Sequence, residues 1–154
     1  FQTQKPVLLH GVTGSGKTEI YTRLAQRAIE NGRNVLYLVP EIALSRQLEE
    51  RLFGYFGESL LIFHSSKTAA EKREVAEKIR KSADEGCGHN YVTLGTRSSL
   101  FLPHHNLGLI VYLTKKIGHI EVLTVLYDGR IGFHENQWNS RFFIASIELN
   151  RMVL

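Results

Sequence analysis

Apolar residues in the first two thirds of the chain follow two patterns, short continuous runs and stripes at helical spacing. The runs predict buried strands at residues 6–10, 35–39, 60–63, 91–94 and 107–111. The stripes predict helices at residues 17–31, 43–56 and 69–81. Strands that alternate with helices favour a parallel sheet covered on both faces. The sequence therefore predicts an α/β fold, with a mainly parallel sheet flanked by helices.

A glycine-rich segment joins the first predicted strand to the first predicted helix. It has the P-loop pattern, and its residues are Gly11, Val12, Thr13, Gly14, Ser15, Gly16, Lys17 and Thr18. Glycines let the backbone approach phosphates closely, and N–H groups at a helix N-terminus bind anions. Lys17 can reach the β- and γ-phosphates of a nucleotide, and Thr18 can offer its hydroxyl to Mg²⁺. The segment predicts a site for ATP with Mg²⁺; the alternative is a glycine-rich turn with a solvated lysine.

Two other strand ends carry candidate chemistry. Pro40 and Glu41 follow the second strand, where they suit a binding loop or simply the start of a helix. Thr96 and Arg97 follow the fourth strand, and small residues beside an arginine suit contact with a phosphate backbone. An ordinary turn with an exposed arginine explains this second segment equally well. From its residues, only the second segment is a candidate for contact with a phosphate backbone.

Histidines also lie near these strand ends. His64 closes the third strand, where a lone histidine is more often a hydrogen-bonded loop residue than a catalyst. His104 and His105 are adjacent, so on a strand they point to opposite faces and make a poor metal pair. The single Cys87 excludes an internal disulfide and a multi-cysteine zinc site. We expect no zinc site and no metal site built from protein ligands alone.

Composition changes this interpretation little. The 154 residues, 43% of them hydrophobic, suffice for one domain with a real core and are few for two. The net charge of +4 permits a nucleic-acid partner, but a solvated basic surface is the simpler interpretation. We expect no leader before the P-loop, and the sequence contains no run of ~18 apolar residues. We expect a cytoplasmic location, no membrane partner, and a chain cut from something larger.

Several segments together resemble the PriA family of replication-restart helicases (primosomal protein N′), which belongs to superfamily two. The matching segments are residues 10–19 with Walker A, 38–44 with motif Ia, 95–101 with motif Ib, and 106–111 with the strand before Walker B. His64 and Ser65 also fall where that family carries such a pair. The resemblance covers residues 6–111, and the order and spacing of the motifs agree throughout.

The resemblance implies a RecA-like P-loop domain, the first lobe of an ATP-driven DNA helicase that moves 3′ to 5′ at stalled forks. It implies that Lys17 and Thr18 serve ATP and Mg²⁺. By the same match, Pro40, Glu41, Thr96 and Arg97 would lie near the DNA strand or a domain interface. The partners that it implies are single-stranded or forked DNA, a second helicase lobe and primosome proteins.

The chain departs from the family pattern after Val111. The family continues with Asp-Glu-Glu-His, acids that hold Mg²⁺ and position the attacking water, but residues 112–116 here read Tyr-Leu-Thr-Lys-Lys. The Walker B acids are therefore not found, and the catalytic residues stay unknown. The apolar run 122–128 ends in Asp128 and is a substitute candidate, although a strand before an Asp-Gly turn explains it better. Another hypothesis is an altered reading frame, because codons for residues 113–116 can encode Asp-Glu-Glu two nucleotides later.

We therefore divide the chain into a first helicase lobe, residues 1–111, and a tail, residues 112–154, without an assignment. In the intact protein the lobe would couple ATP hydrolysis to DNA translocation. The chain alone is not expected to unwind DNA, because it is too short to hold a second lobe. The alternatives are a nucleotide-binding module that is not a motor and a P-loop kinase of small molecules.

Overall fold

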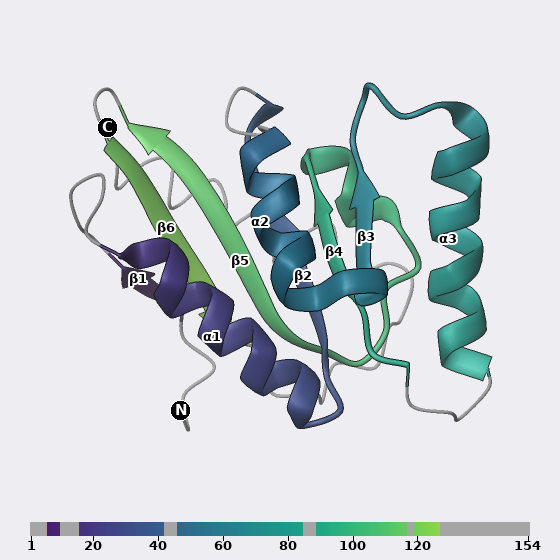
Figure 1. Cartoon of the computed structure of the whole chain (residues 1–154), viewed down its shortest axis with the longest axis horizontal. Coiled ribbons are helices and arrows are strands. Elements are labelled where there is room, and N and C mark those ends of the chain that lie inside the picture. The colour runs from purple at the N-terminus through teal and green to yellow at the C-terminus, as the bar shows by residue number, and fades with distance from the viewer. Residues whose placement is uncertain (1–5, 10–15, 42–45, 85–88, 117–118, 127–154) are drawn as a thin grey trace.

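The protein is described here by a computed structural model that covers residues 6–9, 16–41, 46–84, 89–116 and 119–126 (Figure 1). Its strands are β1 (Pro6–Leu9), β2 (Asn34–Leu38), β3 (Leu60–Phe63), β4 (Val92–Gly95), β5 (Leu107–Lys116) and β6 (His119–Leu126). Its α-helices are α1 (Lys17–Glu30), α2 (Arg46–Phe56) and α3 (Ala69–Asp84). Two short 3₁₀ segments, η2 (Gly57–Ser59) and η3 (Arg97–Phe101), follow α2 and β4.

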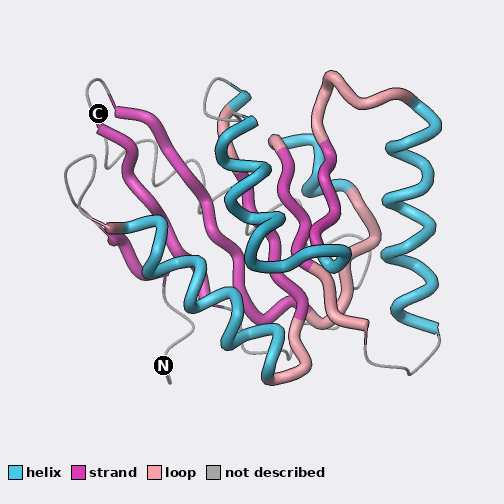
Figure 2. The backbone as a smooth tube through the Cα atoms, in the orientation of Figure 1, coloured by secondary structure: helices cyan, strands magenta, loops and turns pink. Residues whose placement is uncertain are grey.

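The strands form a six-stranded sheet in the order β1-β6-β5-β2-β4-β3. β5, β2, β4 and β3 run parallel to one another, whereas β6 runs antiparallel to both β5 and β1. Figure 2 shows the strands side by side, with α1 and α2 in front of them. Since β1 and β5 both oppose β6, β1 points the same way as the parallel strands. The carboxyl ends of β1 to β5 therefore share one edge of the sheet, called here the carboxyl edge.

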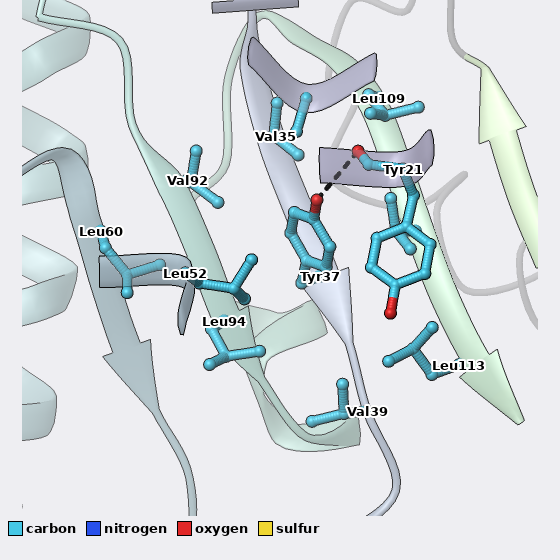
Figure 3. Packing of buried hydrophobic residues seen from close by; sticks show 12 residues of the cluster. Tyr21, Val35, Tyr37, Val39, Leu52, Leu60, Val92, Leu94, Leu109 and Leu113 are labelled. Atoms are coloured by element: carbon cyan, nitrogen blue, oxygen red, sulfur yellow. Dashed lines mark hydrogen bonds between the residues drawn. The ribbon is translucent and has the colours of Figure 1, made fainter. Parts of the chain in front are cut away.

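Helices cover the sheet on both faces because side chains alternate along each strand. In β3, Leu60 packs with the residues of α1 and α2, whereas Leu61 packs with Val75 and Ile79 of α3. The α1 and α2 side holds the largest cluster of buried apolar residues (Figure 3). Because helices cover both faces of the sheet, solvent and ligands reach the parallel strands through the loops at the carboxyl edge.

Tyr37 of β2 is a fully buried polar residue in the middle of this cluster. Its hydroxyl donates a 3.0 Å hydrogen bond to the main-chain carbonyl oxygen of Tyr21 in α1, drawn as the dashed line in Figure 3. The two rings meet edge to face, with centroids 5.8 Å apart. Burial raises the pKa of Tyr37 far above its usual value, so the hydroxyl stays a neutral donor. The bond fixes α1, the helix that follows the P-loop, against the centre of the sheet.

The helix α3 begins with a capping box, Thr68-Ala69-Ala70-Glu71. The Thr68 hydroxyl accepts a 3.2 Å hydrogen bond from the Glu71 main-chain N–H, and Glu71 Oε2 accepts one of 2.8 Å from the Thr68 main-chain N–H. Glu71 Oε2 also accepts a 2.8 Å hydrogen bond from the Thr68 hydroxyl. The two bonds that the carboxylate accepts from Thr68, with one from Lys67, lower the pKa of the Glu71 carboxyl to about 2. The capping box thereby defines where the loop after β3 ends.

The structure confirms the predicted α/β fold with its mainly parallel sheet, and it corrects several boundaries. The strand predicted at 60–63 has those bounds, while those predicted at 35–39 and 91–94 each shift by one residue. The strand predicted at 107–111 is longer, because β5 continues to Lys116 where it pairs with β6. The helix expected at 43–56 is described from Arg46 onward, and α3 ends at Asp84 instead of residue 81. No described helix is long and apolar enough to cross a membrane.

Candidate functional site

The segments that carry the candidate residues meet at the carboxyl edge of the sheet. The main-chain N–H of Val39, just after β2, donates a 2.9 Å hydrogen bond to the carbonyl of Gly95 at the end of β4. The N–H of Thr96 in turn donates to the carbonyl of Phe63 at the end of β3, at 3.4 Å. These bonds bring together the segments after β2, β3 and β4, which lie far apart in the sequence.

The P-loop reaches the described part of the structure at Gly16. This glycine has a φ of +81°, which a residue with a Cβ rarely adopts, and it caps α1 without a side-chain hydrogen bond. Its carbonyl accepts hydrogen bonds from the N–H groups of Glu19 and Ile20, so the helix starts directly after it. A helix N-terminus that no side chain caps is suited to bind an anion. Gly11, Val12, Thr13, Gly14 and Ser15 lie outside the described residues.

Lys17 and Thr18 form the first turn of α1. The backbone of Lys17 is described, but its side chain is not, so its reach toward phosphates stays a prediction. Thr18 is half-buried, and its Oγ1 accepts a 2.9 Å hydrogen bond from the hydroxyl of Tyr21 one turn later. Tyr21 lies within the helix predicted at residues 17–31, and no motif pointed to this contact.

The candidates for nucleic-acid contact differ in their exposure. Pro40 is half-buried and Glu41 is exposed in the segment after β2. Arg97 is exposed at the start of η3, whereas Thr96 beside it is only 5% exposed. The Thr96 hydroxyl lies 3.2 Å from that of Ser98. Thr96 thus holds the turn together, and Arg97 is the charged side chain that it presents to solvent, beside the exposed Ser98 and Phe101.

Close packing between Gly95 and Ser99 fixes the backbone of this turn. A Cβ at Gly95 would lie 2.5 Å from the Phe63 carbonyl oxygen and 2.6 Å from Ser99 Cβ, distances that real Cβ atoms do not show. Ser99 is fully buried, and both its N–H and its hydroxyl donate to the carbonyl of Thr96, at 2.9 and 2.6 Å. The close approach of Ser99 and the Phe63 carbonyl therefore requires glycine at position 95. No sequence motif singled out Ser99 for this role.

Two histidines hold the other side of the η3 turn. The ring of His104, which is 2% exposed, lies with Nε2 2.9 Å from the carbonyl of Ser99. A carbonyl only accepts, so Nε2 carries the proton, and Nδ1 faces the Tyr91 hydroxyl at 3.5 Å. Burial lowers the pKa of His104 to about 4, and His105 adds to the lowering, while the bond to Ser99 opposes it. At neutral pH this histidine is an uncharged support for the turn.

His105 packs against the same tyrosine from a different side. The ring Nε2 of His105 lies 2.9 Å from the Ser82 hydroxyl of α3. The main-chain N–H of His105 donates a 3.2 Å hydrogen bond to the Tyr91 hydroxyl. On a strand the pair would point to opposite faces, but both residues lie in the loop before β5. The pair therefore joins η3, α3 and the start of β4.

His64 at the end of β3 was expected to be a hydrogen-bonded loop residue. Its Nε2 has no hydrogen-bond partner among the described residues, and the nearest carboxylate oxygen, Oε1 of Glu49 in α2, is 3.6 Å away. The residue lies in the loop after β3 as expected, and its main-chain carbonyl accepts a 3.2 Å hydrogen bond from the N–H of Lys67. An ion pair with Glu49 forms only when His64 is protonated.

Comparison with protein families matches residues 1–118 to the DEAD/DEAH box helicases. The chain belongs to this family. Helicases of this family use a nucleotide and Mg²⁺, and the matched part contains the parallel strands with their carboxyl edge. The α/β architecture described above is accordingly the RecA-like fold that was expected.

The curated relatives that match the chain include several replication restart proteins PriA. Replication restart protein PriA of Rickettsia prowazekii is 46% identical over 110 residues, which are 71% of this chain and 16% of that protein. For PriA of Bacillus subtilis the identity is 39% over 107 residues, 70% of this chain and 12% of that protein. For PriA of Helicobacter pylori it is 41% over 110 residues, 71% of this chain and 17% of that protein. The resemblance seen in the motifs is confirmed, and the chain spans less than a fifth of these relatives.

The groups around Thr18 fit a metal ion that arrives with a helicase nucleotide. Thr18 supplies one hydroxyl oxygen, a hard ligand of the kind that Mg²⁺ prefers, at an uncapped helix N-terminus. Among the described residues there is no group of three or more His, Cys, Asp or Glu side chains that can hold a metal. A site with a single protein oxygen suits Mg²⁺ because that ion keeps waters and takes its other ligands from phosphates.

Among the described residues after β5, the strand β6 does not bring its carboxyl end to the carboxyl edge. β6 runs antiparallel to β1, with Leu9 beside Val122 and Pro6 beside Val125, so β6 ends at the opposite edge. The run that was considered as a substitute Walker B strand is therefore a strand of the wrong direction for that role. Asp128 itself lies outside the described residues.

Proposed function

We propose that the chain contains the ATP-binding first motor lobe of a replication-restart DNA helicase that moves 3′ to 5′. In the intact protein this lobe couples ATP hydrolysis to translocation along DNA. The observation that carries the proposal is the convergence of segments at the carboxyl edge. The segments after β2, β3 and β4 are joined there by main-chain hydrogen bonds, and the sheet strand before the P-loop ends at the same edge.

The nucleotide role rests on the start of α1. In this proposal residues 11–17 surround the phosphates of ATP, and Lys17 neutralises part of their charge. Thr18 takes a place in the coordination of Mg²⁺. The left-handed Gly16 and the uncapped helix N-terminus support this assignment. When bound, Mg²⁺ neutralises developing phosphate charge.

The nucleic-acid role rests on the turns after β2 and β4. Arg97 would contact a phosphate of single-stranded or forked DNA, and Thr96 would keep the turn in shape. Pro40 and Glu41 would lie along the same strand of DNA or against a second helicase lobe. The direct bond between Val39 and Gly95 supports a continuous surface across both turns. Primosome proteins are further proposed partners of the intact protein.

A nucleotide-binding module that is not a motor is the second candidate, and the residues after Val111 favour it. Positions 113–116 hold Leu-Thr-Lys-Lys, and β6 ends at the edge away from the P-loop. We propose that residues 112–154 form a segment distinct from the lobe of residues 1–111, and that an altered reading frame produced it. Sequencing the nucleotides tests this origin: Asp-Glu-Glu codons in the shifted frame support it, and their absence rejects it.

The nucleotide assignment is tested by titrating a fluorescent ATP analogue with Mg²⁺ against the chain and its Lys17→Ala variant. A strong loss of affinity is expected, because the variant lacks the cation that faces the phosphates. Lys78→Ala is a matched control, since Lys78 is an exposed lysine on α3 paired with Glu74 at 2.8 Å. Equal affinities of the chain and Lys17→Ala would reject the P-loop assignment.

The DNA assignment is tested by measuring the affinity for single-stranded DNA at several salt concentrations. Arg97→Ala should weaken binding and make the slope of log K against log salt shallower by about 0.7, the value for one phosphate contact. Arg80→Ala, an exposed arginine of α3, is the matched control. An unchanged slope in Arg97→Ala would show that Arg97 makes no phosphate contact. ATP turnover stimulated by DNA after a second lobe is added would separate a motor lobe from a non-motor module.

A further inference from the structure

A buried tyrosine fixes the hydroxyl of Thr18. Tyr21 is 4% exposed, and its hydroxyl donates to Thr18 Oγ1 at 2.9 Å. The two residues are three apart on α1 and so lie on one face of the helix. Tyr21 is in turn immobilised from β2, because the Tyr37 ring meets its ring edge-on and the Tyr37 hydroxyl binds its carbonyl (Figure 3). The orientation of Thr18 is thus set from the core of the sheet.

The direction of the hydrogen bond determines what Thr18 can still do. A threonine hydroxyl has one proton to donate and two lone pairs that accept. The Tyr21 hydroxyl donates, so it occupies one lone pair and leaves the second lone pair and the proton for other partners. A metal ion needs a lone pair, whereas the proton must point away from it. A hydroxyl that rotates freely meets both demands only part of the time.

We propose that Tyr21 is a positioning residue for the Mg²⁺-nucleotide, which holds the free lone pair of Thr18 toward the metal ion. This inference rests on the proposed nucleotide site and goes beyond it, since it assigns a part to a side chain outside the P-loop pattern. An ordinary tyrosine hydroxyl is protonated at neutral pH, so the group remains the donor. Tyr21 acts through Thr18 and has no contact of its own with the nucleotide.

The role predicts an effect that depends on the metal. The chain and Tyr21→Phe are titrated with a fluorescent ATP analogue, once with Mg²⁺ and once with EDTA. Phe keeps the shape of the ring and removes only the donor. The gain in affinity that Mg²⁺ confers should fall about fivefold in Tyr21→Phe, the size of one net hydrogen bond. The affinity without Mg²⁺ should stay the same, because phosphate contacts are untouched.

The chain offers a matched control in the same part of α1. The Tyr55 hydroxyl donates to Glu19 Oε2 at 3.0 Å, so its bond goes to the residue after Thr18 and not to the Thr18 hydroxyl. Tyr55→Phe should leave both affinities unchanged. If Tyr21→Phe keeps the full Mg²⁺ gain, or loses affinity equally with and without Mg²⁺, the positioning role is refuted. A loss of the Mg²⁺ gain in Tyr55→Phe as large as that in Tyr21→Phe refutes it as well.

A double-mutant cycle tests whether Tyr21 acts through Thr18. In a Thr18→Ala background the Tyr21→Phe change should no longer alter the Mg²⁺ gain, and an effect that persists would overturn the inference. Lys17→Ala separates this inference from the proposed function. If Lys17→Ala binds as tightly as the chain, the nucleotide site itself is wrong. If Lys17→Ala is weak and Tyr21→Phe is normal, only the role of Tyr21 is wrong.

Discussion

The buried His104 makes the stability of the protein depend on pH in a defined window. Its Nε2 donates to the Ser99 carbonyl, and Nδ1 faces the Tyr91 hydroxyl. The other titratable ring beside it, His105, lies against the same tyrosine. Among the described residues, the ring is bonded to a carbonyl and faces a phenol and a second imidazole, none of which is an anion that would compensate a charge on it. Protonation would also replace the acceptor at Nδ1 with a second donor.

The size of the effect follows from the two pKa values of His104. The pKa is about 4 in the folded protein against an ordinary value of 6.5, so between these pH values the unfolded chain binds more protons. The contribution of His104 is complete above pH 6.5 and is lost as the pH falls toward 4. A difference of one pKa unit corresponds to 1.36 kcal/mol, so the whole loss is about 3 kcal/mol.

Urea unfolding of the chain and of His104→Gln, followed from pH 7.5 to 4, measures this loss. Glutamine does not titrate, and its amide can still donate to the Ser99 carbonyl. The free energy of unfolding of the chain should fall relative to the variant by about 3 kcal/mol across this range. The comparison cancels carboxylates such as Glu71, which titrate in both proteins. A difference between the two proteins that stays constant with pH would refute the argument.

Further expectations concern the turns and the core. Gly95→Ala places a Cβ 2.6 Å from that of Ser99 and should lower the free energy of unfolding by about 1–3 kcal/mol; a stable variant would mean that the turn can move. Thr68→Ala removes the cap hydroxyl from the Glu71 N–H and should cost about 1 kcal/mol in urea unfolding, with no loss indicating that α3 starts without it. Tyr37→Phe removes the hydroxyl that donates to the Tyr21 carbonyl and should lower the free energy of unfolding by about 1 kcal/mol, seen as a lower thermal midpoint. An unchanged midpoint would show that this bond does not stabilise the protein.

Patterns within single segments predicted the parallel strands of the sheet, but they did not predict the pairing of β5 with β6. Strands such as β2 are continuous apolar runs between turn residues, so each is visible in the sequence by itself. Residues 112–116 are mostly polar, and they extend β5 because β6 pairs with them. Pairing between strands, and the direction of β6, depend on contacts that no single segment contains. The division of the chain at residue 111 stays a prediction.

The candidate site shows the same limit at the level of side chains. The spacing of glycines and lysine identified the P-loop, because phosphate binding demands those residue types in that order. Tyr21 and Tyr37 carried no such mark, since a tyrosine at an apolar position looks like any other core residue. Their hydroxyls gain a role only when α1 packs on β2. The support of the η3 turn by His104 likewise depends on a buried contact with Ser99.

The pairing of β1 with β6 has a consequence for the order in which the molecule assembles. Residues 6–9 leave the ribosome before every other described strand, and their partners, residues 122–125, belong to the last. At 5–20 residues per second the wait between them is roughly ten seconds. During that time the four parallel strands can associate through shorter connections, whereas the strand before the P-loop has no described strand beside it. The side of the sheet that holds the strand before the P-loop is thus completed last, and interrupted synthesis leaves an unpaired apolar strand open to aggregation.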